Sequence, residues 1–438
     1  MAALTVAPEL AVFRARWEAL QRQLTQAEAW LERCAAEAGR DEALAYRLRT
    51  LRAVTARLLD FAATHVAYFF DGPNPPAGYT AQYGLALALR QVGFDLEVIQ
   101  QAACQRLGAA PGSEEQNVLD TADRLARRTL ARALPANPYN AEPPTAITYF
   151  QKSPFIAVIP YAPVALIGLP YSAVSVKRDL LAIPHEVGHY VFWNMRAGRT
   201  YARALPPWVD DHPLGRWAEE TFADVFAALV SGPVGALSLQ DLLVWHDREA
   251  FLASEAGDDH PTPILRPYVY SQALRRRGPE YTALAEQLDR RWARVASRKA
   301  GALTARLPGR AARPIEEWLS MQAAPAGQRP LDFLIQAAEE ALAPVTLEGE
   351  WAGQLARLAG RDLASDGTAA DELDNLFPRR ILEVNEAAPA EVALVSGCWE
   401  AWAQAQATET PGFREDWLAV AHARGWTHGP GDNWPRTG

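Results

Sequence analysis

One short stretch of the chain has a residue spacing that specifies a chemistry, and it reads Ile183-Pro184-His185-Glu186-Val187-Gly188-His189-Tyr190. On an α-helix, His185 and His189 are four positions apart and therefore lie on one face, one turn above each other. Two imidazoles placed in this way can reach the same metal ion, about 2.0–2.1 Å away if the ion is zinc. The stretch therefore predicts a metal-binding helix.

Glu186 lies about 100° round the same helix, because an α-helix has about 3.6 residues per turn. This position puts its carboxylate beside the metal rather than on it, where it can accept a proton from metal-bound water. The chain has only eight histidines, so chance would produce the H-E-x-x-H pattern in roughly one such sequence in a hundred. A helix with two unrelated histidines is the alternative, and further acidic or histidine ligands are needed to exclude it.

A second helical segment carries acidic residues that suit the same metal. The run from Arg216 to Val230 places Glu220 and Asp224 on one face, whereas its opposite side is apolar. Carboxylates on an otherwise buried helix are costly unless a cation or a hydrogen-bond donor is nearby. A hydrolytic zinc site takes three protein ligands and one water, so this helix is expected to supply the missing ligand.

Other third ligands remain open from the residues alone. Glu219 precedes Glu220 but has no acidic partner four residues further on, and His212 lies in a loop. The metzincin pattern would need Gly at position 192 and His at position 195. The chain has Phe192 and Met195 instead, which excludes that class.

Two segments together resemble the gluzincin metallopeptidases, which pair H-E-x-x-H with a later E-x-x-x-D helix: His185-Glu186-Val187-Gly188-His189 and Glu220-Thr221-Phe222-Ala223-Asp224. The resemblance implies that Glu220 is the third zinc ligand and that Asp224 orients a histidine ligand, a role that such outer carboxylates commonly have. It also implies a zincin-like catalytic core that hydrolyses peptide bonds with metal-activated water and Glu186 as general base.

Hydrolysis also needs a donor for the oxyanion, and a segment after the second helix offers several. His260 and Tyr268 are the preferred catalytic candidates, ahead of Tyr270 and Arg266. The H-P-x-P-x-x-R arrangement that begins at His260 resembles the H-P-P segment that follows the glutamate in the CAAX prenyl endopeptidase group. The alternative is a turn-rich loop whose aromatic side chains pack on the core.

The remaining patterns predict a mostly α-helical α+β fold with a small β-sheet. Short β-rich runs precede the metal helix at 145–150, 155–159 and 164–168. Helical patterns lie on both sides, at 8–36, 41–70, 80–107, 113–134, from 278 onward, 315–325, 330–343, 349–365, 389–407 and 412–424. Proline-rich breaks suggest a helical N-terminal domain over 1–140, a zincin-like metallopeptidase core over 141–277 and a helical C-terminal domain over 278–438.

Three local boundaries can be predicted more closely. The metal helix is expected to end at Met195 and to begin either near Ser175, with a kink at Pro184, or at Pro184 itself. Residues 197–214 are expected to form a loop. The helix that carries Glu220 is expected to end at Gly232-Pro233.

Composition limits the partners and the location of the protein. The 438 residues carry a net charge of −9, from 43 basic and 52 acidic residues, which argues against a nucleic-acid or anionic-membrane surface. Cys34, Cys104 and Cys398 suggest neither a disulfide framework nor a cysteine zinc site. The N-terminus lacks a signal-peptide pattern, and the apolar stretch from Phe155 to Pro170 is broken by prolines and too short for a bilayer, so a cytoplasmic protein with no membrane span is expected.

Two functional hypotheses follow from these patterns. The first is a soluble metallopeptidase with Zn²⁺ as cofactor and a peptide or protein as substrate; an endopeptidase is preferred because no G-x-M-E-N aminopeptidase signature occurs. The second is a non-catalytic or partner-gated zinc-binding protein, whose helical domains bind a regulatory protein. Glu186 favours the first, because a structural zinc site usually has four closed ligands and needs no general base.

Overall fold

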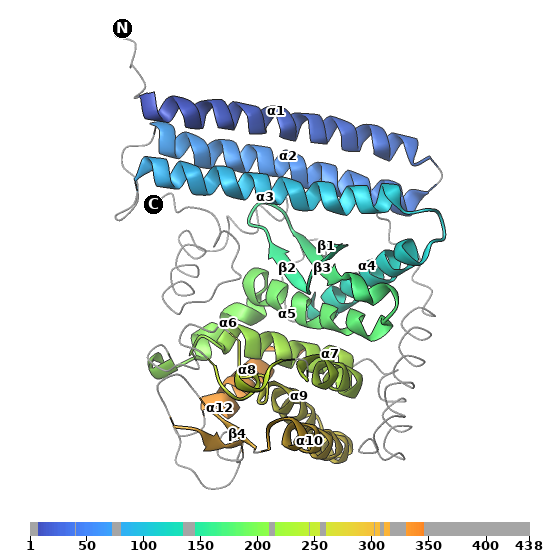
Figure 1. The fold of residues 1–438 in the computed structure, drawn as a ribbon, viewed down its shortest axis with the longest axis vertical. Coiled ribbons are helices and arrows are strands. Elements are labelled where there is room, and N and C mark those ends of the chain that lie inside the picture. The colour runs from blue at the N-terminus through green and yellow to red at the C-terminus, as the bar shows by residue number, and fades with distance from the viewer. Residues whose placement is uncertain are drawn as a thin grey trace.

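The computed structural model describes residues 8–39, 41–71, 80–134, 145–209, 215–244, 246–254, 260–301, 303–306, 311–315 and 330–345. Figure 1 shows three long helices on one side of a small sheet and the remaining helices on the other side. The expected mostly helical α+β fold is thereby confirmed. The expected helices beyond 345, nearly all of the one at 315–325, His212 and Cys398 lie outside the described residues, and the domain boundaries stay predictions.

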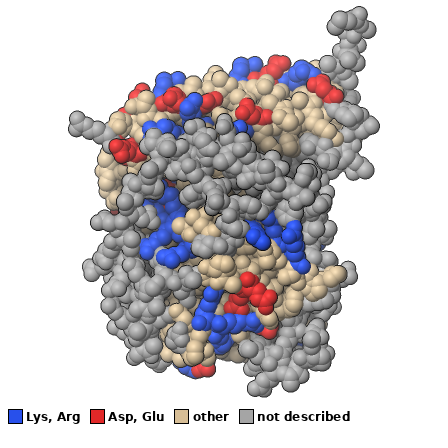
Figure 2. Space-filling view, turned by 180° about the vertical axis from the view of Figure 1, so that it is seen from behind, with Lys and Arg blue, Asp and Glu red and all other residues tan. Residues whose placement is uncertain are grey.

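Three amphipathic helices form the outer layer: α1 (Pro8–Glu37), α2 (Glu42–Asp71) and α3 (Ala81–Gly108). Their leucine and alanine seams meet in a shared hydrophobic core, in which Leu24 and Leu58 are fully buried. Figure 2 shows that side chains of both charges alternate along the outer surface of this layer. The layer therefore has one solvated face and one face that packs inward.

The predicted sheet is present, with the strands β1 (Thr145–Gln151), β2 (Phe155–Val158) and β3 (Val164–Pro170). The strand order is β1-β3-β2, with β1 parallel and β2 antiparallel to the central β3. Because side chains alternate along a strand, Ile147 joins the core under α1–α3, whereas Phe150 joins the core of the lower helices. The sheet therefore connects the two hydrophobic cores.

Side chains from neighbouring helices close the outer edge of β1. Asp123, on α4 (Glu114–Ala133), accepts a hydrogen bond from the backbone N–H of Thr148 at 2.8 Å. Gln105 accepts from the backbone N–H of Phe150 at 2.7 Å and also donates to its carbonyl oxygen at 2.8 Å. These bonds use the groups with which β1 could bind a further strand, whereas β2, the other edge strand, pairs only with β3 among the described strands.

Asp123 also ties the outer layer to the sheet. Its buried carboxylate accepts from Arg47 on α2, from Arg106 on α3 at 2.9 Å, and from the Thr148 hydroxyl at 2.7 Å. Burial alone would raise the pKa of Asp123, but Arg106 and Arg47 outweigh it and lower the pKa to about 2. The carboxylate is therefore ionised, and α2, α3, α4 and β1 share one buried charged group.

The metal helix is separate from the segment before it. The short 3₁₀ helices η2 (Tyr171–Val174) and η3 (Lys177–Ala182) lead into α5 (Ile183–Asn194), and Pro184 lies in the first turn of α5. A proline is tolerated there because the first backbone N–H groups of a helix have no partner within it. Of the two predicted arrangements, the helix start at Pro184 is therefore the correct one.

The predicted loop over 197–214 is wrong for its first part, which forms α6 (Arg196–Ala204). The chain turns back sharply here: a Cβ at Gly198 would lie only 1.9 Å from the carbonyl oxygen of Phe192. Tyr201 is fully buried and donates a hydrogen bond to the carbonyl of Ala218 at 3.1 Å. Tertiary packing of this kind stabilises a helix that local sequence does not indicate.

The helical backbone that carries Glu220 is interrupted at Gly232-Pro233, as predicted; a second helical segment follows directly, and the two together form α7 (Ala218–Leu243). Gly232 has φ 59° and ψ −150°, so it forms a kink, and Pro233 lies in the first turn of the continuing helix. Among the described residues, α7 is the one helix long and apolar enough to cross a membrane, but 94% of its apolar window is buried inside the fold. Such burial is typical of a core helix.

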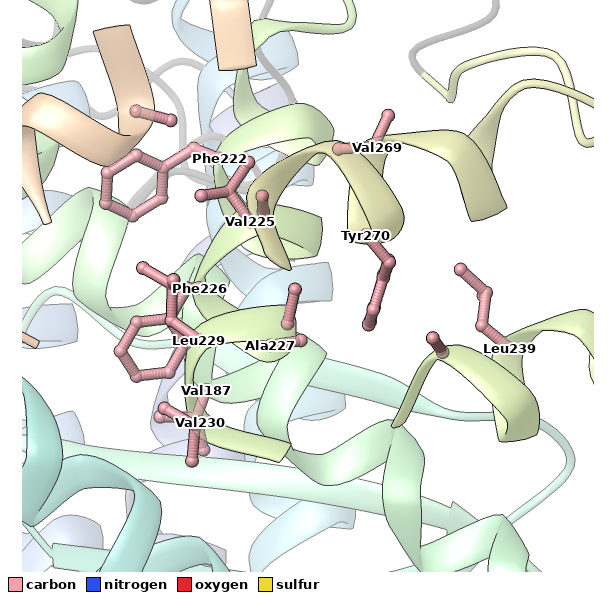
Figure 3. Close-up of a cluster of buried hydrophobic side chains, with 14 of the residues drawn as sticks. Val187, Phe222, Val225, Phe226, Ala227, Leu229, Val230, Leu239, Val269 and Tyr270 are labelled. Atoms are coloured by element: carbon pink, nitrogen blue, oxygen red, sulfur yellow. The ribbon is translucent and has the colours of Figure 1, made fainter. Parts of the chain in front are cut away.

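The lower helices surround α7. They are α8 (Arg248–Leu252), α9 (Arg266–Arg275), α10 (Pro279–Ala300) and α12 (Pro330–Ala341), with a two-residue pairing of β4 (Thr304–Ala305) and β5 (Arg313–Pro314). Figure 3 shows Val225, Phe226 and Leu229 of α7 in the cluster that also contains Val269 and Tyr270 of α9. This packing fixes the helix that carries Glu220 against its neighbours.

Glu339 on α12 is expected to make the stability of the fold depend on pH. Its carboxylate contacts Arg276 at 3.1 Å, while its second oxygen is buried with no hydrogen bond to any described residue. Burial raises the pKa of Glu339 to about 7, despite the opposing charges of Arg276 and Arg277. The folded chain therefore holds a proton that the unfolded chain releases near pH 4.5, and stability should fall as pH rises from about 4.5 to about 7.

Glu339→Gln should remove this dependence and stabilise the fold at pH 8 by about 1–3 kcal/mol. Urea unfolding at pH 5 and pH 8 measures the effect, and Glu286→Gln, at an exposed glutamate on α10, is the matched control. A variant that is no more stable than the wild type at pH 8 would contradict the assignment.

Candidate metal centre

Three side chains from two helices converge on one point. His185 and His189 of α5 and Glu220 of α7 bring their ligand atoms within 4.8 Å of one another, so the group can hold a metal ion. The two Nε2 atoms of His185 and His189 are 3.2 Å apart. The structure thus places together the three residues predicted from the sequence as metal ligands.

The close approach of α5 and α7 depends on two small residues. A Cβ on Gly188 would lie 2.7 Å from the Cα of Ala223 and 3.0 Å from its Cβ. Gly188 lies between the two histidines in sequence, and Ala223 lies between Glu220 and Asp224. A larger residue at either position would separate the helices at the level where the imidazoles face the carboxylates.

Glu220 is the strongest sign that the group is built for a cation. Its side chain is 1% exposed, and neither carboxylate oxygen has a hydrogen bond to any described residue. Nevertheless, Nε2 of His185 lies 3.3 Å from one oxygen, and Nε2 of His189 lies 3.4 Å from the other. A buried carboxylate is stable only when its charge is compensated; His260 and Arg266 lie 3.1 Å and 3.3 Å from Glu220, and a metal ion between Glu220 and the two imidazoles would add to that compensation.

The charges around Glu220 keep its carboxylate ionised. Burial raises its pKa, but the nearby imidazoles of His260, His189 and His185 outweigh burial and hold the pKa well below its usual range. An ionised carboxylate and two imidazoles form the donor set that zinc commonly takes in hydrolytic sites. The residues present therefore fit a divalent metal.

Asp224 contacts His185, as the resemblance implied. Its Oδ1 lies 2.9 Å from Nδ1 of His185, which leaves Nε2 facing Glu220. Arg266 in turn donates two hydrogen bonds to Asp224, at 2.9 Å and 2.7 Å. Burial lowers the pKa of His185, but Asp224 and Glu220 reverse the effect and raise it to about 10. Because an imidazole ligand must be neutral, a bound metal would displace this proton.

Glu219, the alternative third ligand, lies on the other side of His189. Its Oε1 is 2.8 Å from Nδ1 of His189 and accepts a hydrogen bond from the indole of Trp193 at 2.7 Å. Glu219 thus contacts the ring nitrogen of His189 that faces away from Glu220. The structure places Glu220, rather than Glu219, in the metal group.

Glu186 lies in the first turn of α5, next to His185 in sequence and outside the metal-ligating group. Burial, followed by the charge of Glu186, raises the pKa of Tyr149 on β1 above its usual range. Glu186 also contributes to the raised pKa of Tyr270. The charge of Glu186 therefore acts on one tyrosine of the sheet and on one tyrosine of α9.

The predicted oxyanion donors differ in their distance from the metal group. His260 is 58% exposed, and its Nε2 lies 3.1 Å from Glu220, so it borders the site on the solvent side. Tyr268 lies on α9 with its side chain in the hydrophobic core, and its catalytic role stays a prediction. The acidic residues of the site affect Tyr270. Burial and then the charge of Asp224 raise the pKa of Tyr270 well above the usual range, so its hydroxyl stays protonated.

Arg266 has more contacts with the site than the sequence analysis predicted. Besides its bonds to Asp224, its guanidinium lies 3.3 Å from Glu220 and 3.3 Å from Nε2 of His185. The spacing of six residues from His260 was the available signal. It could not show that Arg266 faces inward, because that depends on how α9 packs on α7.

No protein-family model matches the chain, and no curated protein or solved structure is significantly similar to it. The functional conclusion therefore depends on the residues of the site.

Proposed function

We propose that this protein is a zinc-dependent metallopeptidase of the gluzincin type. The observation that carries the proposal is the buried Glu220 carboxylate, whose oxygens have no hydrogen bond to any described residue while two imidazoles face them. Two histidines four apart and a carboxylate from a second helix are three protein ligands, the number that catalytic zinc sites use together with a water. An open position is what separates a catalytic site from a structural one.

The residues around the proposed zinc have distinct roles. His185, His189 and Glu220 would hold the ion, which supplies a Lewis acid that polarises a carbonyl and makes water acidic near neutral pH. Glu186 accepts the proton of the attacking water and then delivers it to the leaving amine. His260 borders the site and donates to the oxyanion that develops on the substrate; Tyr268 and Tyr270 are the other candidates for this donor.

The sheet supports an extended peptide as substrate. The outer edge of β1 is closed by Asp123 and Gln105, whereas β2 is an edge strand among the described strands and packs against the metal helix α5. A substrate strand that pairs with β2 would run beside the metal group, held by backbone hydrogen bonds that do not depend on its sequence. Cleavage within a chain is the natural outcome of such binding.

The second candidate function is a zinc-binding protein that is silent or gated by a partner. The observation in its favour is the outer layer, whose helices α2 and α3 are bonded to β1 through the buried charge of Asp123. A partner that moved this layer would also move the sheet that borders the site. The intact Glu186 favours the catalytic proposal.

A mixed peptide library tests the proposal. Zinc-loaded protein, chelator-treated protein and protein restored with zinc are compared, and we expect cleavage in the first and third samples, at internal positions. Cleavage that persists after the metal is removed, or protein that binds no zinc, would overturn the proposal. Stoichiometric zinc without cleavage would favour the gated alternative.

A further inference from the structure

Glu219 forms a connection that the proposed mechanism does not use. It is 2% exposed and lies on α7, directly before Glu220. One of its carboxylate oxygens, Oε1, contacts both Nδ1 of His189 at 2.8 Å and the indole nitrogen of Trp193 at 2.7 Å. His189 and Trp193 are four residues apart on α5, so one oxygen of α7 joins two successive turns of the metal helix.

The chemistry of the three groups fixes the direction of each hydrogen bond. An indole N–H can only donate, and an ionised carboxylate can only accept. When Glu219 is ionised, Nδ1 of His189 carries the hydrogen in the bond between them. In a neutral imidazole the lone pair then belongs to Nε2, which is the atom that faces Glu220 and His185.

The same arrangement occurs at the other histidine. Nδ1 of His185 lies 2.9 Å from Asp224, which is five residues after Glu219 on the same helix. Both imidazoles are thus held from behind by carboxylates of α7, and Glu220 lies between these carboxylates in sequence. A carboxylate behind an imidazole ligand orients the ring and increases its basicity.

We infer that Glu219 is a positioning residue for the metal: held by Trp193, it keeps His189 in the tautomer and orientation that direct Nε2 at the ion. This inference rests on the proposed zinc site but does not require cleavage. A purely structural role, in which Glu219 only joins α5 to α7, is the rival explanation. That role would change stability without a specific effect on the metal.

The test measures zinc affinity by competition with a chromogenic chelator in full-length wild type and in the variants Glu219→Ala, Glu219→Gln and Trp193→Phe. Glu219→Ala should bind zinc about 10–100-fold more weakly, the usual loss when the partner of a ligand is removed. Glu219→Gln should recover most of the affinity, because its amide oxygen still accepts from both N–H groups. Trp193→Phe should fall between them, because the carboxylate remains but loses the hydrogen bond from the indole. Glu249→Ala, on a side chain that is 87% exposed, is the control.

Two further readouts separate the explanations. The visible absorption of the cobalt-loaded protein should keep the intensity of a four-coordinate site in Glu219→Ala and change only in band position. Thermal unfolding of the metal-free variants should not follow the order of their zinc affinities. Wild-type affinity in Glu219→Ala, a cobalt spectrum that shows a lost ligand, or affinities that simply follow stability would each overturn the inference. Zinc-loaded wild type that does not cleave would defeat the proposed peptidase alone, whereas a wild type without zinc would defeat both.

Discussion

Glu186→Gln is expected to retain bound zinc and to lower kcat/KM for peptide cleavage by about 10²–10⁴-fold, the usual contribution of a general base. Glutamine has nearly the same size as glutamate, so the buried first turn of α5 should be preserved. Its amide cannot accept the proton of the attacking water or deliver it to the leaving amine. The loss should therefore appear in kcat, with little change in KM.

Zinc content and cleavage of one internally quenched peptide measure the two halves of this prediction. Glu249→Gln, at a glutamate that is 87% exposed on α8, is the matched control and should behave as the wild type. Full activity of Glu186→Gln would rule out the proposed mechanism. Loss of zinc from this variant would instead show that Glu186 is a ligand.

Glu220→Ala is expected to weaken zinc binding by more than about 100-fold, because it removes a direct ligand and even the partner of a ligand commonly contributes about 10–100-fold. Two histidines alone do not complete the set of three protein ligands that hydrolytic zinc sites use. The variant also leaves His185, His189 and Arg266 facing an empty position. Cleavage should be lost together with the metal.

Equilibrium dialysis gives the affinity, and circular dichroism shows whether the helical content is retained. Glu286→Ala is the comparison, since that glutamate is 56% exposed on α10 and far from α7 in sequence. If Glu220→Ala binds zinc as the wild type does while Glu219→Ala does not, the third ligand is Glu219 and the assignment of the site must be revised.

The elements that could be predicted from the sequence are those with strong local signals. The seams of α1 and α2 repeat apolar residues at helical spacing, and the three strands are short β-rich runs separated by prolines. The wrong prediction, a loop where α6 forms, has a physical cause. The helix depends on tertiary contacts that local sequence does not indicate: Gly198 permits a close approach to the backbone of Phe192, and Tyr201 is buried and bonded to the carbonyl of Ala218.

The metal ligands were predictable because their spacing within each helix determines which side chains share a face. The contacts that hold the ligands from behind could not be predicted, because they depend on which helices pack against each other. Trp193 and Arg266 reach the site only through the packing of α5 and α9 against α7. Gly188 and Ala223 are ordinary residues in sequence, and their role becomes visible only at the contact between the two helices.

The burial of α7 has a consequence for the synthesis of the protein. This helix is complete at Leu243, but α9, α10 and α12, which cover it, end at Arg275, Ala300 and Ala341. On the ribosome, about a hundred further residues must be made at roughly 5–20 residues per second before the last of these helices is complete. During those seconds the nascent chain presents a segment as apolar as a membrane span, so chaperones that shield such segments should bind it until α12 has docked.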